Sequence, residues 1–212
     1  MSRLIDAGLE QLTTILFKMG EVAERTISDA VKGFIESEDV SEEIRELSEI
    51  LVTTTVSVEE KAFELMVKYQ PVASDLRIIN SYMKIAYDLE RYGRYAWDIC
   101  LAYQNTPRTQ DCVDSQKHLE KMARKVMEMV RMSIQGLRDF DAELIKKLAE
   151  TEKEVDKMYF KYLDFLADTR VSAQCMICNV LIVRYLERLA DHATYLGEAI
   201  IYIATGEKVL LR

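Results

Sequence analysis

Residues 85–96 read IAYDLERYGRYA, and residues 182–193 read IVRYLERLADHA. The two stretches lie 97 positions apart and share the pattern Ile-x-x-x-Leu-Glu-Arg-x-small, where x is any residue. A pattern that recurs at a fixed offset indicates an internal duplication, so positions in one half have counterparts in the other. The sequence therefore predicts two units of the same fold in one chain.

Helical periodicity runs through nearly the whole chain of 212 residues. Apolar residues recur every three or four positions, and Gly (7) and Pro (2) are scarce. We expect one helix along the apolar stripe at 9–34, and others at about 41–69, 74–103, 111–138, 141–168 and 171–204. Because long antiparallel helices with short connections form bundles, the prediction is an all-α fold of two tandem three-helix bundles. Their expected bounds are 1–104 and 109–212, with a linker near 104–110 that contains Pro107.

Several residues are expected to cap these helices. Ser41, and either Ser74 or Asp75, are candidate N-caps, because short polar side chains accept hydrogen bonds from free backbone N–H groups. Asp141 is a third candidate N-cap. Gly206 is expected to end the last helix, since glycine readily adopts the left-handed conformation found there.

The chain is acidic, with 36 Asp and Glu residues against 28 Lys and Arg and a formal net charge of −8. Nucleic-acid binding needs clustered Lys and Arg, so we expect no nucleic-acid partner. Hard cations, which take oxygen ligands, suit such a chain better. The N-terminus lacks the apolar core of a secretion signal, and no apolar run approaches the ~20 residues that cross a bilayer. We therefore expect a cytoplasmic protein.

The four cysteines are Cys100, Cys112, Cys175 and Cys178. Cys175 and Cys178 form a single CxxC motif in an apolar helical segment, and no second CxxC accompanies it. We interpret all four as small buried thiols in a reducing compartment, with a redox or metal role as the alternative.

Two pairs of acidic residues occur at helical spacing in the second half. Glu187 and Asp191 lie four positions apart, as do Glu152 and Asp156 on the preceding expected helix. Residues four apart share a helix face. If the two helices are neighbours, four carboxylates converge, and such oxygen-rich clusters bind Mg, Ca, Mn or iron ions. The sequence predicts a metal site made of these four residues.

The first half has lost half of each pair. Thr55 stands in place of Glu152, and Arg94 stands in place of Asp191. Glu90 then has a cation four residues on, which predicts a self-contained ion pair that needs no metal. We expect divalent or iron ions, including a multinuclear cluster, to bind in the second repeat only.

The acidic pairs have three interpretations: the metal site described above, a solvated face of a structural scaffold, and a di-metal enzyme. On a solvated face, Glu187 pairs with Arg184 and Glu152 pairs with a neighbouring lysine. A ferritin-type di-metal enzyme requires a Glu three residues before a His, and neither His118 nor His192 has one. His192 itself is more typical of a capping or surface residue than of a ligand. We also find no nucleophile and base motif, so we expect no enzyme.

Aromatic residues gather on the third expected helix, in numbers that exceed what one bundle core readily uses. Because Tyr and Trp are favoured at interfaces, we expect the chain to self-associate, most simply as a homodimer. The residues are Tyr82, Tyr87, Tyr92, Tyr95 and Trp97.

Four motifs resemble a known family. Residues 70–77 (QPVASDLR) and 88–93 (DLERYG) resemble the first-half signature of PhoU, a family of phosphate-uptake regulators. Residues 184–193 (RYLERLADHA) resemble its second-half signature, and residues 201–207 (IYIATGE) resemble its C-terminal ending. The resemblance therefore spans both repeats.

The resemblance implies two three-helix bundles related by a pseudo-two-fold axis. It implies a cytoplasmic, membrane-peripheral negative regulator, with the ATP-binding subunit of a phosphate transporter or a sensor kinase as partner. Members of the family can bind metal clusters, iron among them, through E(D)xxxD motifs. Here Glu152-x-x-x-Asp156 and Glu187-x-x-x-Asp191 keep that motif, whereas the first-half counterparts do not.

Overall fold

The computed structural model describes residues 3–139 and 141–211, and within them it contains seven α-helices and no strand. The helices are α1 (Asp6–Glu36), α2 (Ser41–Tyr69), α3 (Ala73–Gln104), α4 (Gln110–Lys117), α5 (Glu120–Asp139), α6 (Ala142–Asp168) and α7 (Ala173–Thr205). The predicted all-α class is confirmed.

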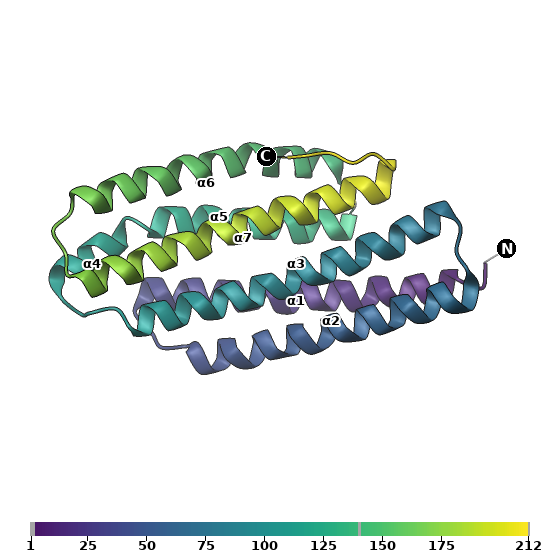
Figure 1. Cartoon of the computed structure of the whole chain (residues 1–212), viewed down its shortest axis with the longest axis horizontal. Coiled ribbons are helices and arrows are strands. Elements are labelled where there is room, and N and C mark those ends of the chain that lie inside the picture. The colour runs from purple at the N-terminus through teal and green to yellow at the C-terminus, as the bar shows by residue number, and fades with distance from the viewer. Residues whose placement is uncertain (1–2, 140, 212) are drawn as a thin grey trace.

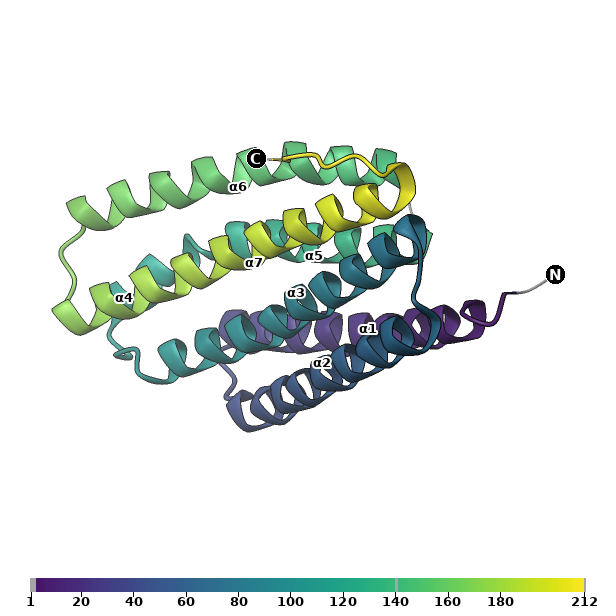
Figure 2. The same ribbon diagram turned by 45° about the vertical axis from the view of Figure 1, so that its right-hand side comes forward.

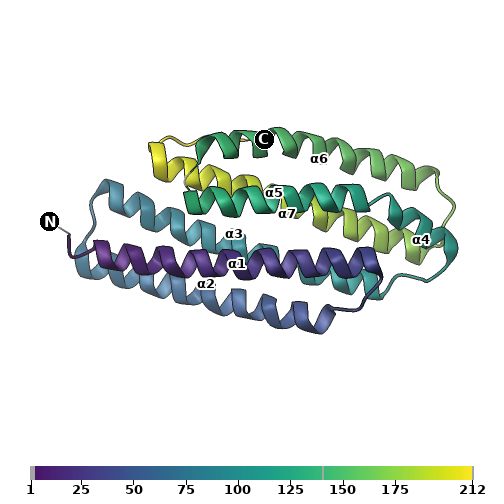
Figure 3. The same cartoon turned by 180° about the vertical axis from the view of Figure 1, so that it is seen from behind.

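The helices form two groups that lie side by side, α1–α3 in one and α4–α7 in the other (Figure 1). α2 and α6 lie at the two outer edges in both front views (Figure 1, Figure 2). The groups meet where α3 packs on α7 and where α1 packs on α5, which the rear view shows together (Figure 3). Buried apolar side chains from both groups form one continuous core.

The pairing of α3 with α7 repeats itself under the 97-residue offset. His192 Nδ1 lies 2.8 Å from Asp88 Oδ1. The counterparts of these residues are Tyr95 and Tyr185, and their rings stack with centroids 6.1 Å apart. A contact that recurs with the two halves exchanged is what an approximate two-fold axis produces. The duplication is thus visible in the interface that it created.

The expected fourth helix is broken, which corrects the prediction of one helix over 111–138. α4 ends at Lys117 and α5 begins at Glu120. The N–H groups of His118 and Leu119 donate to carbonyls three residues back, at 3.3 and 2.9 Å, so the turn tightens there. Ser115 Oγ also donates to the Cys112 carbonyl at 2.7 Å, a local bond that competes with regular helix.

Two cysteines form a disulfide, which contradicts the expectation of four free thiols. Cys112 on α4 is bonded to Cys175 at the start of α7, with Cα atoms 5.9 Å apart. Cys100 and Cys178 are free and buried, as expected. The bridged residues are separated by 63 positions, so only the packing of α4 beside α7 brings them within bonding distance.

The expected caps were half right. Asp141 accepts from the N–H groups of Glu143 and Leu144, and Gly206 ends α7 with φ 78°. Ser41 is not an N-cap. Asp39 instead accepts from the Ser41 N–H at 3.1 Å and from its hydroxyl.

The start of α3 also differs from the prediction. Val72 precedes the helix in an extended conformation and makes no side-chain cap, so neither Ser74 nor Asp75 has the predicted role. Asp75 is buried and accepts from Arg3 at 2.8 Å, which ties the start of α3 to the segment before α1.

The aromatic residues of α3 are largely used inside the chain. Tyr92 is fully buried, and its hydroxyl bonds Ser133 of α5. Tyr82 and Tyr95 are also buried, and Trp97 packs against the core. Tyr92 and Tyr95 contact the other half, which accounts for part of this excess of aromatic residues. Tyr87 is 52% exposed and is not buried in this way.

Candidate metal site

The four predicted carboxylates lie on two neighbouring helices. Glu152 and Asp156 belong to α6, Glu187 and Asp191 belong to α7, and these helices pack on each other. Glu152 is 4% exposed and Asp191 is 8% exposed, whereas the other two are partly buried. The structure therefore brings the predicted acids to one face and removes two of them from solvent.

The carboxylates perturb one another. The pKa of Glu152 is raised to about 7, first because burial disfavours its charge and then because Asp156 and Asp191 are negative. The pKa of Glu187 is raised by burial and then by Asp191, with a smaller contribution from Asp156. Acids on α6 and α7 therefore raise each other's pKa, as expected if the four carboxylates form one cluster.

Two arginines of α7 offset part of this charge. Arg184 Nη1 lies 2.7 Å from Glu187, and Arg188 Nη1 lies 3.3 Å from Asp191. The Arg184 contact is the one expected for a solvated face. Glu152, by contrast, makes no ion pair with either neighbouring lysine among the described residues. The arginines therefore offset charge on α7, whereas the buried Glu152 of α6 has only the weaker attraction of Lys153.

One oxygen of the cluster has no hydrogen-bond partner. Glu187 Oε2 is buried and accepts no hydrogen bond, and the Arg188 Nε atom is 4.0 Å away. A buried acceptor without a donor is costly, and a hard cation is the partner that an all-oxygen set of donors fits. Within residues 3–139 and 141–211, no three Asp, Glu, His or Cys side chains are already grouped closely enough to hold a metal. Binding would therefore require the carboxylates to move closer together.

The first-half positions are built differently. Thr55 is buried and its hydroxyl bonds the backbone carbonyls of Leu51 and Ala86, at 3.1 and 3.3 Å. Glu59 is exposed. Where the second half has a buried carboxylate, the first half thus has the neutral hydroxyl of Thr55, which is already hydrogen-bonded.

Arg94 corrects one detail of the prediction. Its Nε atom lies 3.4 Å from Asp98 and its guanidinium lies over the Trp97 ring. No ion pair joins it to Glu90 in the described part of the chain. The cation at this position therefore compensates a different acid, one turn further along α3.

His192 is neither a surface residue nor placed as a helix cap. It is 6% exposed and pairs with Asp88, a residue that the sequence reasoning missed. Burial raises the pKa of Asp88, and the His192 hydrogen bond opposes that rise. Asp88 could have been noticed in the sequence, because it is an acidic residue among apolar ones within the repeated motif of the third helix.

Two three-helix bundles, joined through equivalent helices and carrying spaced acidic pairs on one half, define a tandem-repeat helical protein. A family model described as "PhoU domain" matches the chain twice, over residues 16–102 and 119–200. The chain belongs to the PhoU family. The two matched segments reproduce the duplication seen in the sequence.

Individual relatives agree with this assignment. A phosphate-specific transport system accessory protein PhoU homolog from Pseudomonas putida is 30% identical over 99% of this chain and 84% of its own length. The phosphate-specific transport system accessory protein PhoU from Escherichia coli K12 is 24% identical over 98% of this chain and 88% of its own length. The crystal structure of PhoU from Pseudomonas aeruginosa superposes with a TM-score of 0.87 at 27% identity, covering 96% of this chain and 100% of that one.

Proposed function

We propose that this protein is a regulator of phosphate uptake and phosphate signalling that binds metal and acts as an adaptor. Its relatives are named as accessory proteins of the phosphate-specific transport system. Family membership over nearly the whole chain is the observation that carries the proposal. The proposed partner is the ATP-binding subunit of a phosphate transporter or a sensor kinase, reached at the cytoplasmic face of the membrane.

An adaptor of this kind is recruited to the membrane by its partners. None of the described helices has both the length and the apolar character needed to cross a bilayer, so a peripheral position suits it. In the cytoplasm the Cys112–Cys175 bridge would have to persist against a reducing environment.

The proposed metal site consists of Glu152, Asp156, Glu187 and Asp191. The buried oxygen of Glu187 that lacks a donor and the raised pKa of Glu152 both support a missing cation. The ligands are oxygens only, which suits a divalent or iron ion. We assign this site to the second repeat alone, because Thr55 and Arg94 have replaced two of the four acids in the first.

Two other functions are less well supported. A di-metal carboxylate enzyme would need a Glu-x-x-His pair, which neither histidine of this chain provides. A purely structural scaffold would leave no reason for the unsatisfied Glu187 oxygen or for the raised pKa of Glu152. The relatives are likewise named as accessory proteins, and no catalytic role is proposed.

The adaptor function is tested by capture from native cells. The chain carrying a C-terminal tag is expressed from its own locus, purified without detergent and with mild detergent, and its bound proteins are identified by mass spectrometry. We expect a transporter ATP-binding subunit or a sensor kinase, and deletion of the gene should raise phosphate uptake in phosphate-rich medium. Unchanged uptake together with no bound transport or kinase component would contradict the proposal.

Self-association as a homodimer is also proposed. The strongest remaining support is a pair of exposed phenylalanines at equivalent positions, Phe63 at 58% exposed and Phe160 at 63%. Sedimentation equilibrium at micromolar concentration should give a dimer mass, and Phe63→Ser with Phe160→Ser should shift it toward monomer. A monomer mass for the wild type would refute the dimer without touching the regulatory proposal.

A further inference from the structure

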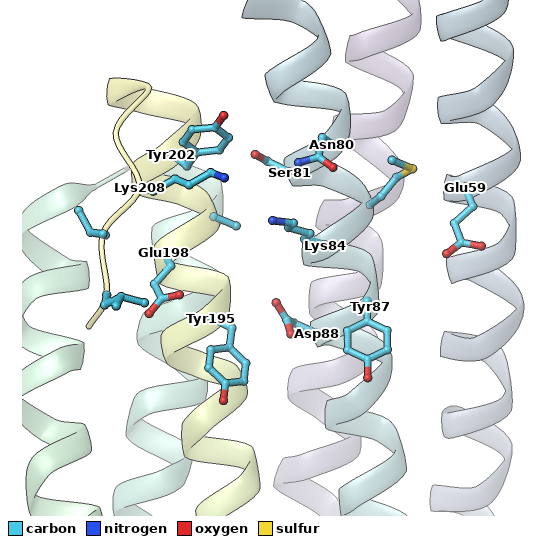
Figure 4. Close-up of a pocket in the computed structure, with 14 residues that line it drawn as sticks. Glu59, Asn80, Ser81, Lys84, Tyr87, Asp88, Tyr195, Glu198, Tyr202 and Lys208 are labelled. Atoms are coloured by element: carbon cyan, nitrogen blue, oxygen red, sulfur yellow. The ribbon is translucent and has the colours of Figure 1, made fainter. Parts of the chain in front are cut away.

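A cavity of about 750 Å³ lies between α3 and α7, outside the metal site. Asn80, Ser81 and Lys84 contribute to it from α3, Tyr195, Glu198 and Tyr202 from α7, and Lys208 from the segment that follows α7 (Figure 4). Such a volume falls in the range of small-molecule sites, roughly 300–1,000 Å³. The cavity sits on the contact between the two halves, so a ligand there would touch both.

The lysines of this cavity form no close ion pair, although Lys84 lies near enough to Asp88 to lower the pKa of that carboxyl. Neither Lys84 nor Lys208 forms an ion pair within the described residues, although acids outnumber bases 36 to 28 in the chain. Arg77, one turn before Ser81 on the same helix, also lacks one. In an acidic protein rich in ion pairs, cations that gather without forming an ion pair leave a place for an anion.

Two buried donors at the same end have no acceptor. Ser81 is 0% exposed and its Oγ atom has no hydrogen-bond partner. Figure 4 shows this hydroxyl directed from α3 toward α7. The Nε atom of Arg77 is likewise buried and unpartnered. Buried donors are normally satisfied, so both point to an acceptor that the chain itself does not supply.

The segment after α7 holds its lysine in place. Gly206 turns the chain with φ 78°, and a Cβ there would meet the Arg77 guanidinium at 2.6 Å. The cations of Arg77 and Lys208 each lie 5.8 Å from the Tyr202 ring. Cation–π attraction to one aromatic ring thus keeps two positive charges close together.

The acids that line the cavity are engaged in part by the chain itself or lie away from this end. Glu198 accepts from the Leu211 N–H at 3.0 Å, and Asp88 is paired with His192. Glu59 reaches the cavity from α2, on the far side of α3 from Tyr202 (Figure 4). Figure 4 places Lys208, Ser81 and Asn80 at one end of the cavity and Asp88 with Tyr195 at the other. The cavity therefore has a cationic end and an acidic, aromatic end.

We propose that this cavity binds a small organic phosphate ester, with the phosphate group between Lys84, Lys208 and the Ser81 hydroxyl. A phosphate monoester carries close to two negative charges and three acceptor oxygens near neutral pH, which matches two cations and an unsatisfied hydroxyl. The organic part extends toward Glu198 and Tyr195, where hydroxyl or amino groups find acceptors and an aromatic ring. The proposal rests on these residues alone and is independent of the regulatory role and of the metal site.

Calorimetric titration tests the proposal with three probes: AMP, glucose 6-phosphate and inorganic phosphate. The full chain is used in buffer with a chelator, so that phosphate held by metal does not contribute. We expect saturable binding of at least one ester, at least about tenfold tighter than inorganic phosphate. Lys84→Gln with Lys208→Gln should weaken it at least about tenfold for loss of two charge-assisted contacts, and Ser81→Ala should weaken it less.

The matched control is Lys18→Gln with Lys147→Gln, because both lysines are exposed, form no ion pair in the described chain and change the net charge equally. Affinity within about twofold of wild type in this control supports the site. Equal weakening in both double variants would mean diffuse attraction and would overturn the proposal. So would binding of inorganic phosphate as tight as that of the esters, or no probe binding with Kd below about 1 mM. Thermal melts of each variant confirm that it is folded.

Discussion

The two halves of this molecule share one helical plan, apart from the break between α4 and α5, and differ in the charges on one face. In the second half, α6 and α7 bring together four carboxylates, of which Glu152 is buried and forms no close ion pair among the described residues. At the equivalent place in the first half, Thr55 satisfies itself on backbone carbonyls. Arg94 has also turned to Asp98. Duplication preserved the packing and released the polar face to diverge.

The difference shows how the polar face of a duplicated bundle can change without loss of the fold. A buried carboxylate needs an external cation or a raised pKa, whereas a threonine needs neither because its hydroxyl bonds a carbonyl of its own helix. The first half therefore has a face that is stable by itself. The second half keeps a buried carboxylate, whose pKa is raised to about 7 by burial and by its acidic neighbours.

The largest expected effect concerns metal affinity. Asp191→Ala should weaken metal binding by more than the ~10–100-fold that loss of an outer-shell partner costs, because it removes a direct oxygen ligand. Metal content after purification without a chelator and calorimetric titration of the stripped protein with Mn²⁺ and Fe²⁺ would measure this.

The matched control for that variant is Asp98→Ala, which removes a partly buried acid from the first half. We expect its metal affinity to equal that of wild type. If Asp191→Ala binds as tightly as wild type, or if stripped wild type shows no affinity in the micromolar range, the four acids form a solvated face and the site is wrong.

A second experiment tries to restore the lost site. Thr55→Glu with Arg94→Asp rebuilds both acid pairs in the first half, alongside Glu59 and Glu90. Without metal this variant should be less stable, by about 1–3 kcal/mol for a buried group whose hydrogen bonds are lost. With metal it should regain stability and bind additional metal. A stoichiometry identical to that of wild type would show that more than these two positions separates the halves.

Sequence alone gave the repeat, the helices and the four acids, because each depends on local periodicity or on the fixed offset. The acid pairs were predictable since residues four apart share a face on any helix. The break between α4 and α5 was not, because it depends on hydrogen bonds around Ser115 and on contact with α7. The Cys112–Cys175 bridge was missed for the same reason: its two ends meet only after packing.

Pairing across the interface was equally hidden. Arg94 had two acids within four residues, Glu90 before it and Asp98 after it, and the sequence does not decide between them. The Asp88–His192 contact joins residues 104 positions apart. The partner of each polar group depends on how the apolar faces of the helices pack, because that packing decides which polar groups lie opposite each other.

A third experiment compares the two halves of the shared interface. The Asp88–His192 pair is buried and hydrogen-bonded, whereas its counterpart, Tyr95–Tyr185, is a stacked aromatic pair. Double-mutant cycles with His192→Ala and Asp88→Asn should give a coupling near 1.5–3 kcal/mol, typical of hydrogen bonds to charged groups. The cycle for Tyr95→Leu and Tyr185→Leu should give about 0.5–1.5 kcal/mol.

Urea unfolding of the four single and two double variants provides these coupling energies. The matched positions make each cycle the control of the other, since both replace residues that the duplication made equivalent. A larger coupling for the tyrosines would mean that the interface depends on its aromatic contacts and that the Asp88–His192 pair adds little.

The smallest expected effect is on the pH dependence of stability. The pKa of Glu152 is raised to about 7 in the folded chain, above its value when unfolded, so the folded state binds the proton more tightly. Stability of the metal-free protein should therefore rise as pH falls from about 8 toward 5, and decline again through this range as pH increases. Glu187 contributes in the same direction.

Glu152→Gln keeps the shape and removes the charge, so its melting temperature should exceed that of metal-free wild type at pH 8 and change less between pH 5 and 8. Thr55→Ser, at the equivalent position, should leave the wild-type pH profile intact. If the melting temperatures of wild type and Glu152→Gln change equally with pH across this range, the Glu152 carboxylate has an ordinary pKa. The two halves would then differ in their arginines alone.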